Sequence, residues 1–472
     1  MREVLSSEAL SPWQPSSGDA WDLKKAAHLG RRAAFGARRE ELDLMLQQGP
    51  DAAIEALFHP GSNASFEQLF AQLEGFFFDL SRRDGLQRWW CYRMLHGPGP
   101  LRERMTLFWH DHFATSIRKV GRGRYMQLQN ETLRKHALGK FGDLLLAISK
   151  DPAMLIWLDN RLSSKGRPNE NYARELLELF ALGRDHYEEG DIKEVARAFT
   201  GWTTSSGRFV FSKNRHDAGE KTIFGKKGKW GGEDVIDLIL ENPHTARFVA
   251  GKIWKDLVGE WLPEDVHEDL AQGFRESSYD IAALVGRILR SRAFFSEQAH
   301  RSRIADPAEY VLGIVRRLES RPRISTVASQ IAILGQALFA PPGVEGWKRG
   351  EAWLSARWCL LRIAAVASLV NLRGASGEAR WDVVAYCKKH GLKVDEQIVD
   401  HFLDLFVDGE VEPATRARLL HYLNHVDRSG KAKKGEKGPD RKSPFKPDYR
   451  HIDNKVRGLV NLILSLPEAQ TV

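Results

Sequence analysis

Ionisable side chains lie within segments that otherwise have the composition of a buried helix, and this pattern constrains the fold of the 472-residue chain most strongly. The segment Phe108–Ser116 contains His110, Asp111 and His112 among aromatic residues. Ionisable groups are costly to bury unless they are paired, hydrogen-bonded or bound to a metal. The sequence therefore predicts a central helix over residues 101–115 whose polar side chains have partners elsewhere in the fold.

A second segment of this kind begins at Pro168–Asn169, and Gly183 is expected to end its helix, with Asn169 as the N-cap. Residues three or four apart share a helix face. Helical proteins hold divalent metals with carboxylates at this spacing, completed by imidazoles from another helix. The side chains of interest in this segment are Asn169, Glu170, Asn171, Arg174, Glu175 and Glu178. We expect Glu170 and Arg174 to pair, and Asn171, Glu175 and Glu178 to lie along one face.

His110 and His112 cannot both face that second helix, because residues i and i+2 of a helix point about 200° apart. His112 shares a face with Met105 and Phe108 and is the expected inward group. Asp111 is expected to orient one of the two imidazoles.

The pair His216–Asp217 lies in a segment of different composition, residues 203–232, which is rich in Gly, Lys, Ser and Thr. Only Phe209–Phe211 and Thr222–Phe224 have β-like composition there, so we expect an ordered loop or a small hairpin. Such loops often carry functional groups. His216 and Asp217 are therefore candidates for a proton-transfer pair.

Helical periodicity dominates the rest of the chain, which predicts an all-α fold with one small extended excursion. Either one large domain or two closely associated domains fits this length. The expected organisation is a disordered lead-in at 1–21, a main helical domain at 22–427, a basic flexible insertion at 428–450, and a C-terminal helix at 451–472 that packs back on the main domain.

The net charge of +8 comes almost entirely from one segment. Residues 428–457 hold 11 Lys and Arg against 4 Asp and Glu, a net +7, which leaves +1 for the rest. Its most basic part, residues 428–446, has one aromatic residue, Phe445, so it lacks the stacking platform of single-strand binders and does not indicate nucleic-acid binding.

The three cysteines have neither zinc-type nor redox spacing. The first 20 residues have no signal-like apolar core, and no apolar run is long enough to span a bilayer. These features predict a cytoplasmic protein without a membrane span.

Three interpretations of the polar cluster remain open: a structural network, a metal or cofactor site, and metal-free acid/base catalysis. The metal hypothesis, which leaves the cofactor unknown beyond a candidate divalent ion, takes His112, Glu175 and Glu178 as ligands. The ligand-pocket residues would be His110, Asn169, Glu170, Asn171 and Arg174, and the catalytic residues His216 and Asp217. The pocket would be closed by residues 203–232, and a hydrolytic reaction is one expectation.

Several motifs together resemble the bacterial family catalogued as domain of unknown function 1800. They include His28–Gly36, Phe108–Ser116, Asp151–Asn160, Pro168–Gly183 and Leu338–Trp347. The segments Ala196–Trp202, His216–Asp217, Lys221–Gly225 and Val460–Glu468 add to the resemblance, which covers most of the chain.

The resemblance implies little chemistry, but it implies a protein partner similar to alkaline phosphatases and sulfatases. The alternative hypothesis is accordingly a non-enzymatic scaffold whose contact surfaces are the loop Ala340–Trp347 and the basic segment at 428–446. A third hypothesis is haem-peroxidase-like chemistry, based on an Arg near a Glu and a His on buried helices.

Overall fold

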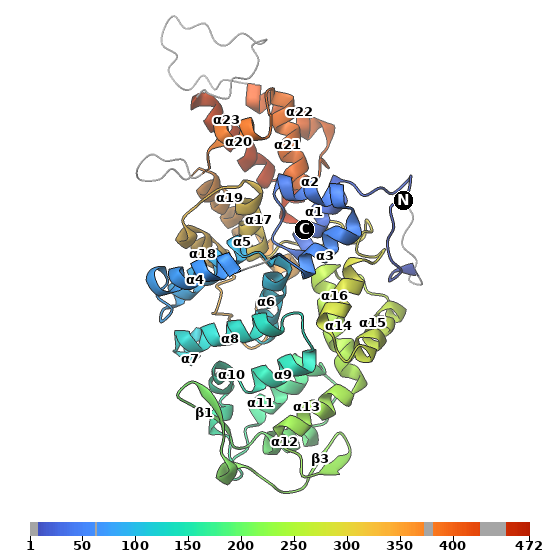
Figure 1. The fold of residues 1–472 in the computed structure, drawn as a ribbon, viewed down its shortest axis with the longest axis vertical. Helices are drawn as coiled ribbons and strands as arrows, with labels where there is room; N and C mark the ends of the chain where they lie inside the picture. Colours follow the sequence, from blue (N-terminus) through green and yellow to red (C-terminus); the bar gives the residue numbers. More distant parts are fainter. Residues whose placement is uncertain (1–7, 62–63, 372–380, 425–449) are drawn as a thin grey trace, which may run out of the picture. The chain divides into compact units, whose positions relative to one another are not determined.

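A computed structural model describes residues 8–61, 64–371, 381–424 and 450–472 (Figure 1). The chain divides into two compact units. Unit 1 comprises residues 1–14, 51–300 and 336–348, and unit 2 comprises residues 15–50, 301–335 and 349–472. The predicted all-α class is confirmed, because helices account for nearly all of the regular structure among the described residues. The basic insertion predicted at 428–450 lies outside the described residues, apart from its last position.

Unit 1 holds most of the helices and all of the described strands. Its helices up to the second polar segment are α3 (Pro50–Phe58, in unit 1 from Asp51), α4 (Ala64–Phe77), α5 (Arg83–His96), α6 (Pro100–His112), α7 (Ile117–Val120), α8 (Gly123–His136), α9 (Phe141–Ser149), α10 (Pro152–Trp157) and the 3₁₀ turn η2 (Asn160–Leu162). The remainder are α11 (Glu170–Glu175), η3 (Leu176–Ala181), α12 (Glu189–Ala198), the 3₁₀ turn η4 (Lys213–Arg215), α13 (Gly232–Glu241), α14 (Pro243–Leu257), α15 (Glu264–Glu276) and α16 (Ile281–Leu289).

Two of these helices begin where the sequence supplies both a cap and a proline. Asp151 and Asn242 accept hydrogen bonds from backbone N–H groups of the first turns of α10 and α14, and Pro152 and Pro243 follow them. A side-chain cap satisfies an N–H group that has no partner inside the helix, and proline at the first helical position loses no hydrogen bond.

The segment 203–232 forms two hairpins, where the sequence predicted a loop or a single hairpin. One pairs β1 (Trp202–Ser205) with β2 (Arg208–Phe211), and the other pairs β3 (Lys221–Ile223) with β4 (Lys226–Gly228). Both two-residue turns have positive φ at both positions: 50° and 76° at Ser206–Gly207, and 49° and 74° at Phe224–Gly225. Such turns match the twist of antiparallel strands. Phe224 is therefore a turn residue, although the composition of Thr222–Phe224 suggested a strand.

Helix α6 lies at the centre of unit 1 and packs against α5 and α8 (Figure 1). From Leu101 to His112 every side chain is buried except Arg102. The buried charges of its first turns are paired: Glu103 binds Arg134 on α8, and Arg104 lies 2.8 Å from Asp256 on α14. A buried charge without a partner would cost several kcal/mol, so these pairs fix how α8 and α14 pack against α6.

Unit 2 is also helical. Its elements are α1 (Leu23–Ala33), α2 (Arg39–Gln48), α17 (Pro307–Arg317), α18 (Ile324–Ile333), the 3₁₀ turn η5 (Gly350–Trp353), α19 (Ala356–Val370), α20 (Val383–Lys389), α21 (Asp395–Val407), α22 (Pro413–Asn424), α23 (Arg450–Leu464) and the 3₁₀ turn η6 (Pro467–Gln470). Helices α17, α18 and α19 pack side by side, and α23 packs against α19, α21 and α22 (Figure 1).

A buried carboxylate, Asp408, organises the arginines of unit 2. Its side chain is fully buried and accepts two hydrogen bonds from Arg31, at 2.7 and 2.8 Å, and one from Arg301 at 2.9 Å. Burial and the neighbouring positive charges lower the pKa of Arg301 to about 10 and that of Arg317 to about 9. Asp408 therefore neutralises positive charge that the core of unit 2 could not otherwise hold.

Replacing Asp408 with Asn should destabilise unit 2 by about 3–5 kcal/mol, because buried guanidinium groups lose their counter-charge. The matched control is Asp400→Asn on α21, whose pair with Arg416 is exposed by 46% and 39% and should be worth less than about 1 kcal/mol. Urea denaturation of the full chain measures both. Equal midpoints for the two variants would contradict this role for Asp408.

Candidate functional site

His110 and Asp111 hold the loop 336–348 against the end of α6. The Phe339 N–H donates to Nε2 of His110 at 3.1 Å, and the Trp347 N–H donates to Oδ1 of Asp111 at 2.7 Å. Burial lowers the pKa of His110 to about 3, so this imidazole is neutral at physiological pH. Its Nε2 accepts a hydrogen bond, so the proton lies on Nδ1. His110 and Asp111 therefore anchor the loop 336–348. Asp111 binds a backbone N–H group, whereas the sequence predicted that it would orient an imidazole.

His112 points to a different segment, as the helical spacing predicts. Its Nε2 lies 3.0 Å from the carbonyl oxygen of Phe180. A carbonyl only accepts hydrogen bonds, so Nε2 must carry the proton. A metal ion at this nitrogen would have to displace the proton and break the bond to Phe180.

The carbonyl of Phe180 belongs to a π-helical turn. The predicted regular helix at 169–183 is α-helical only over α11, and continues as the π-helix η3 to Ala181. The Leu182 N–H bonds to the carbonyl of Leu177, five residues back. Single π turns are rare and occur often at functional sites. In this wider turn, the angle around the helix axis between Glu175 and Glu178 differs from the angle in a regular α-helix.

Glu178 faces a small cleft and already has two partners. Nε of Arg184 lies 2.7 Å from one carboxylate oxygen, and the Tyr187 hydroxyl donates to the other at 3.0 Å. Burial and this hydrogen bond raise the pKa of Tyr187 to about 12, so the phenol stays protonated. The Arg184 side chain is 69% exposed, and such surface ion pairs contribute little free energy. Glu178 is therefore only weakly tied to Arg184.

Glu175 lies one turn before Glu178 and is half-buried. Burial, followed by the negative charge of Glu178, raises the pKa of Glu175, and Glu345 adds to the effect. The positive charge of Arg174 opposes this shift only in part. Among the described residues, Glu175 has no ion-pair partner.

The cleft beside these carboxylates has a volume of about 290 Å³. It is lined by His112, Glu178, Leu179, Gly183, Arg184, Phe248, Lys252, Val344 and Glu345. These residues come from α6, η3 and the turn that follows it, α14 and the loop 336–348. The segment 203–232, which was expected to close the pocket, contributes none of them.

The candidate ligand-pocket residues at the start of α11 do not line this cleft. Asn169 caps α11 as predicted, and its amide also donates to the carbonyl of Leu158 at 2.7 Å. Glu170 and Asn169 line a separate depression of about 440 Å³, and Asn171 is exposed. The predicted Glu170–Arg174 pair is wrong, because Arg174 binds both carboxylate oxygens of Glu189, at 2.8 and 3.0 Å.

His216 and Asp217 lie beside the end of α12. Nδ1 of His216 is 2.9 Å from the Thr200 carbonyl oxygen, and Arg197 binds both carboxylate oxygens of Asp217, at 2.8 and 3.2 Å. The Arg197 hydrogen bonds lower the pKa of Asp217. Asp217 is therefore a poor proton donor near neutral pH, and its contacts secure the hairpin segment to α12.

The structure thus brings His112, Glu175 and Glu178 to one region and leaves the other candidates elsewhere. Within the described part of unit 1, no group of three His, Cys, Asp or Glu side chains brings its ligand atoms within 4.8 Å of one another. A metal site here would have to assemble when the ion binds.

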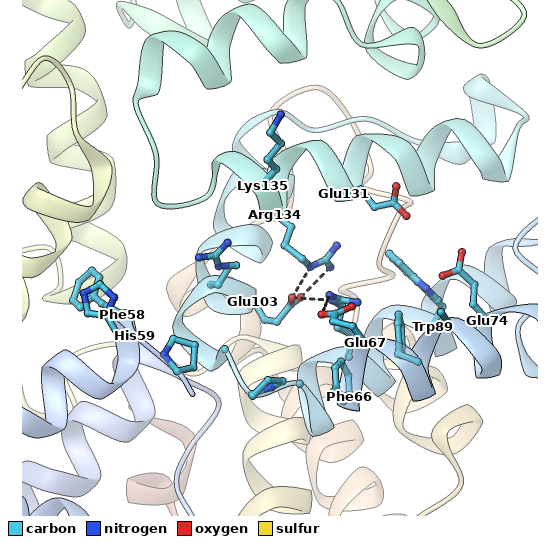
Figure 2. Close-up of a pocket in the computed structure, with 18 residues that line it drawn as sticks. Phe58, His59, Phe66, Glu67, Glu74, Trp89, Glu103, Glu131, Arg134 and Lys135 are labelled. Carbon is cyan, nitrogen blue, oxygen red and sulfur yellow. Dashed lines mark hydrogen bonds and ion pairs between the residues drawn. The ribbon is translucent and has the colours of Figure 1, made fainter. Parts of the chain in front are cut away.

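Sequence reasoning missed Phe248, Lys252 and Glu345, which complete the cleft. It also missed a larger cleft of about 690 Å³ beside α4, α5 and α8, with Glu103 and Arg134 among its lining residues (Figure 2). The charged triplet Arg102–Arg104 at the start of an apolar helix was the available signal for the second cleft. No comparable signal existed for the first, because its lining residues come from distant segments.

The family model described as "Protein of unknown function (DUF1800)" matches residues 28–471, so the chain belongs to that family. The resemblance noted in the sequence is confirmed. No curated protein and no solved structure matches the chain. No helix among the described residues is both long enough and apolar enough to cross a membrane.

The hydrogen bond between Asp111 and the loop 336–348 can be tested with two glycines of that loop. Gly346 has φ +82°, and an added Cβ would lie 2.2 Å from Oδ1 of Asp111, whereas Gly343 has open space around it. We expect Gly346→Ala to cost more than about 2 kcal/mol and to speed amide exchange at Trp347. Gly343→Ala should stay within about 0.5 kcal/mol. Hydrogen exchange and urea denaturation measure these effects, and equal exchange in both variants would contradict the tie.

Proposed function

We propose that this protein binds a small cationic ligand, with a hard divalent metal ion as the leading candidate, at Glu175 and Glu178. The observation that carries the proposal is the half-buried carboxylate of Glu175, whose pKa is raised and whose charge no described side chain neutralises by an ion pair. A bound cation would relieve the repulsion between Glu175 and Glu178.

The donor chemistry favours Mg²⁺, Ca²⁺ or Mn²⁺ over Zn²⁺. Carboxylates and water suit hard ions, whereas zinc sites use imidazole and thiolate. His112, the imidazole that the sequence suggested as a ligand, donates its Nε2 proton to Phe180. Its role in this proposal is to hold the π turn that carries Glu178. Glu345, on the rim of the cleft, is the third candidate carboxylate.

Arg184 is the internal competitor for the cation. Its guanidinium occupies one oxygen of Glu178 but is largely exposed, so a divalent ion can displace it at small cost. Lys252 also lines the cleft and would repel a cation that bound beside it. The proposal therefore places the ion at the side of the cleft formed by η3 and the Glu345 rim.

His216 and Asp217, the proton carriers expected from sequence, do not line the cleft and are bound to Thr200 and Arg197.

The proposal is tested by calorimetric titration of the metal-free full chain with Mn²⁺, Mg²⁺, Ca²⁺ and Zn²⁺. We expect Glu175→Gln and Glu178→Gln each to weaken binding of the preferred hard ion at least about tenfold, through loss of a charged ligand. Arg184→Ala should strengthen binding, because the competing cation is removed. The matched control Glu189→Gln, in an exposed pair one helix away, should leave affinity unchanged.

Absence of binding at millimolar ion concentration, with folded protein, would refute the proposal. Binding that both Glu175→Gln and Glu178→Gln leave intact would refute it as well. Binding that Arg184→Ala weakens would place the ion elsewhere.

The scaffold alternative is favoured by one feature, the anchored loop 336–348. Leu338, Phe339 and Trp347 are buried, while Pro342 and Glu345 at the tip are exposed. A rigid exposed tip suits recognition by a protein partner of the phosphatase or sulfatase class. The basic segment that was the second proposed contact surface lies outside the described residues. A pull-down that recovers such a partner with the unaltered chain, and loses it with Pro342→Arg, would support this alternative.

A further inference from the structure

The larger cleft in unit 1 has its own charge pattern, independent of the carboxylates at Glu175 and Glu178. Its volume is about 690 Å³, within the range of small-molecule sites. Side chains of α4 and α8 line it, with contributions from α5, the start of α6 and the end of α3 (Figure 2). We call it the α4–α8 cleft.

The middle of the α4–α8 cleft is electrically balanced. Arg134 binds Glu103 through two nitrogens, and the same carboxylate lies 3.4 Å from Nε of Arg93. Arg93 also pairs with Glu67 and lies 4.8 Å from the centre of the Phe70 ring. Two carboxylates thus face two guanidinium groups, and this part of the cleft has no charge left over.

One end carries two carboxylates that are held together. The amide nitrogen of Gln127 donates to both Glu74 and Glu131, and its distance to Glu131 is 2.9 Å. Figure 2 shows these two glutamates on the same side of the Glu103–Arg134 pair. Burial and the charge of Glu74 raise the pKa of Glu131, although the charges of Arg124 and Arg134 oppose the shift. This end has excess negative charge.

The other end carries a cation. Arg102 lines the cleft beside Phe58 and His59, and these three residues also line an adjoining cleft of about 580 Å³. Lys135 also lines the cleft, but its side chain points away from the Glu103–Arg134 pair (Figure 2). Among the described residues, neither Arg102 nor Lys135 has an ion-pair partner.

We propose that the α4–α8 cleft binds a short peptide with free termini, its carboxylate held by Arg102 and its ammonium group by Glu74 and Glu131. Opposite charges at the two ends select a zwitterion, because an anion or a cation alone would be repelled by one end. The balanced middle suits an uncharged peptide backbone, and the aromatic rings of Phe58 and Phe66 provide apolar contact for side chains.

The spacing sets the length of the peptide. Glu67, beside the balanced middle, and Glu74, at the acidic end, are seven residues apart on α4, which corresponds to about 10 Å at 1.5 Å per residue. Phe58 and His59, which line the basic end with Arg102, lie on the other side of Glu103 from Glu74 (Figure 2). An extended peptide covers about 3.3–3.6 Å per residue, so at least three residues are needed to reach both ends.

The test is calorimetric titration of the full chain with tetra-alanine, its N-acetyl derivative and its C-terminal amide. Tetra-alanine should bind, and blocking either terminus should lower affinity at least about tenfold, because a charged hydrogen bond is lost and the opposing side chain is left unpaired. Arg102→Ser should lower affinity for tetra-alanine but not for its amide. Glu131→Gln should lower affinity for tetra-alanine but not for its N-acetyl form.

Arg83→Ser is the matched control, since Arg83 is exposed on α5 and does not line the cleft. It should leave all three affinities unchanged, and circular dichroism confirms that each variant is folded. Three outcomes would overturn the proposal: no binding of tetra-alanine at millimolar concentration, equal affinity for the blocked and free peptides, or loss of affinity on blocking only one terminus. The last outcome would indicate a site for a singly charged ligand.

Discussion

The structure of unit 1 depends on the cost of burying helix α6. Five ionisable residues of this helix are buried, two near its start and three at its end: Glu103, Arg104, His110, Asp111 and His112. Each unpaired group would cost about 1–3 kcal/mol or more, a large share of a typical domain's stability. All five have partners, so α6 fixes where α8, α14, η3 and the loop 336–348 can lie. The charged pairs near its start set helix packing, and the polar bonds near its end set backbone positions.

This constraint separates two kinds of polar group that look alike in the sequence. His110, Asp111 and His112 are bound to backbone groups and are committed to structure. Glu175 is half-buried with a raised pKa and no ion-pair partner among the described residues. A structural network and a candidate site therefore coexist, and His112 links them, because its bond to Phe180 fixes the π turn that presents Glu178.

The sequence was sufficient for the fold class and for the central position of α6, because both follow from the periodicity of apolar residues. It also placed the Asn169 cap and the opposite directions of His110 and His112. It failed where a tertiary contact overrides local pattern. Arg174 pairs with Glu189 across a turn, and the π turn after Glu175 depends on a hydrogen bond from α6. The short helix α20 was not predicted because seven residues give little periodic signal.

The hairpins show the same limit. Ser206–Gly207 and Phe224–Gly225 adopt the two-residue turns usually associated with Asn–Gly, so the sequence signal was weak. The candidate catalytic residues His216 and Asp217 were singled out by their chemistry, but their chemistry does not reveal that Thr200 and Arg197 bind them. The lining of both clefts comes from segments far apart in the chain, which no local pattern brings together.

The central claim is that both α6 histidines are bonded to backbone groups, and histidine tautomers measured by ¹⁵N NMR on the selectively labelled full chain test it most directly. The account predicts that His110 carries its proton on Nδ1 and His112 on Nε2. It further predicts that His110 stays neutral from pH 8 to 5, since its pKa lies near 3. Addition of divalent metal should leave the Nε2 signal of His112 protonated. Titration of His110 near its ordinary pKa, or loss of the Nε2 proton of His112 on metal binding, would contradict the account.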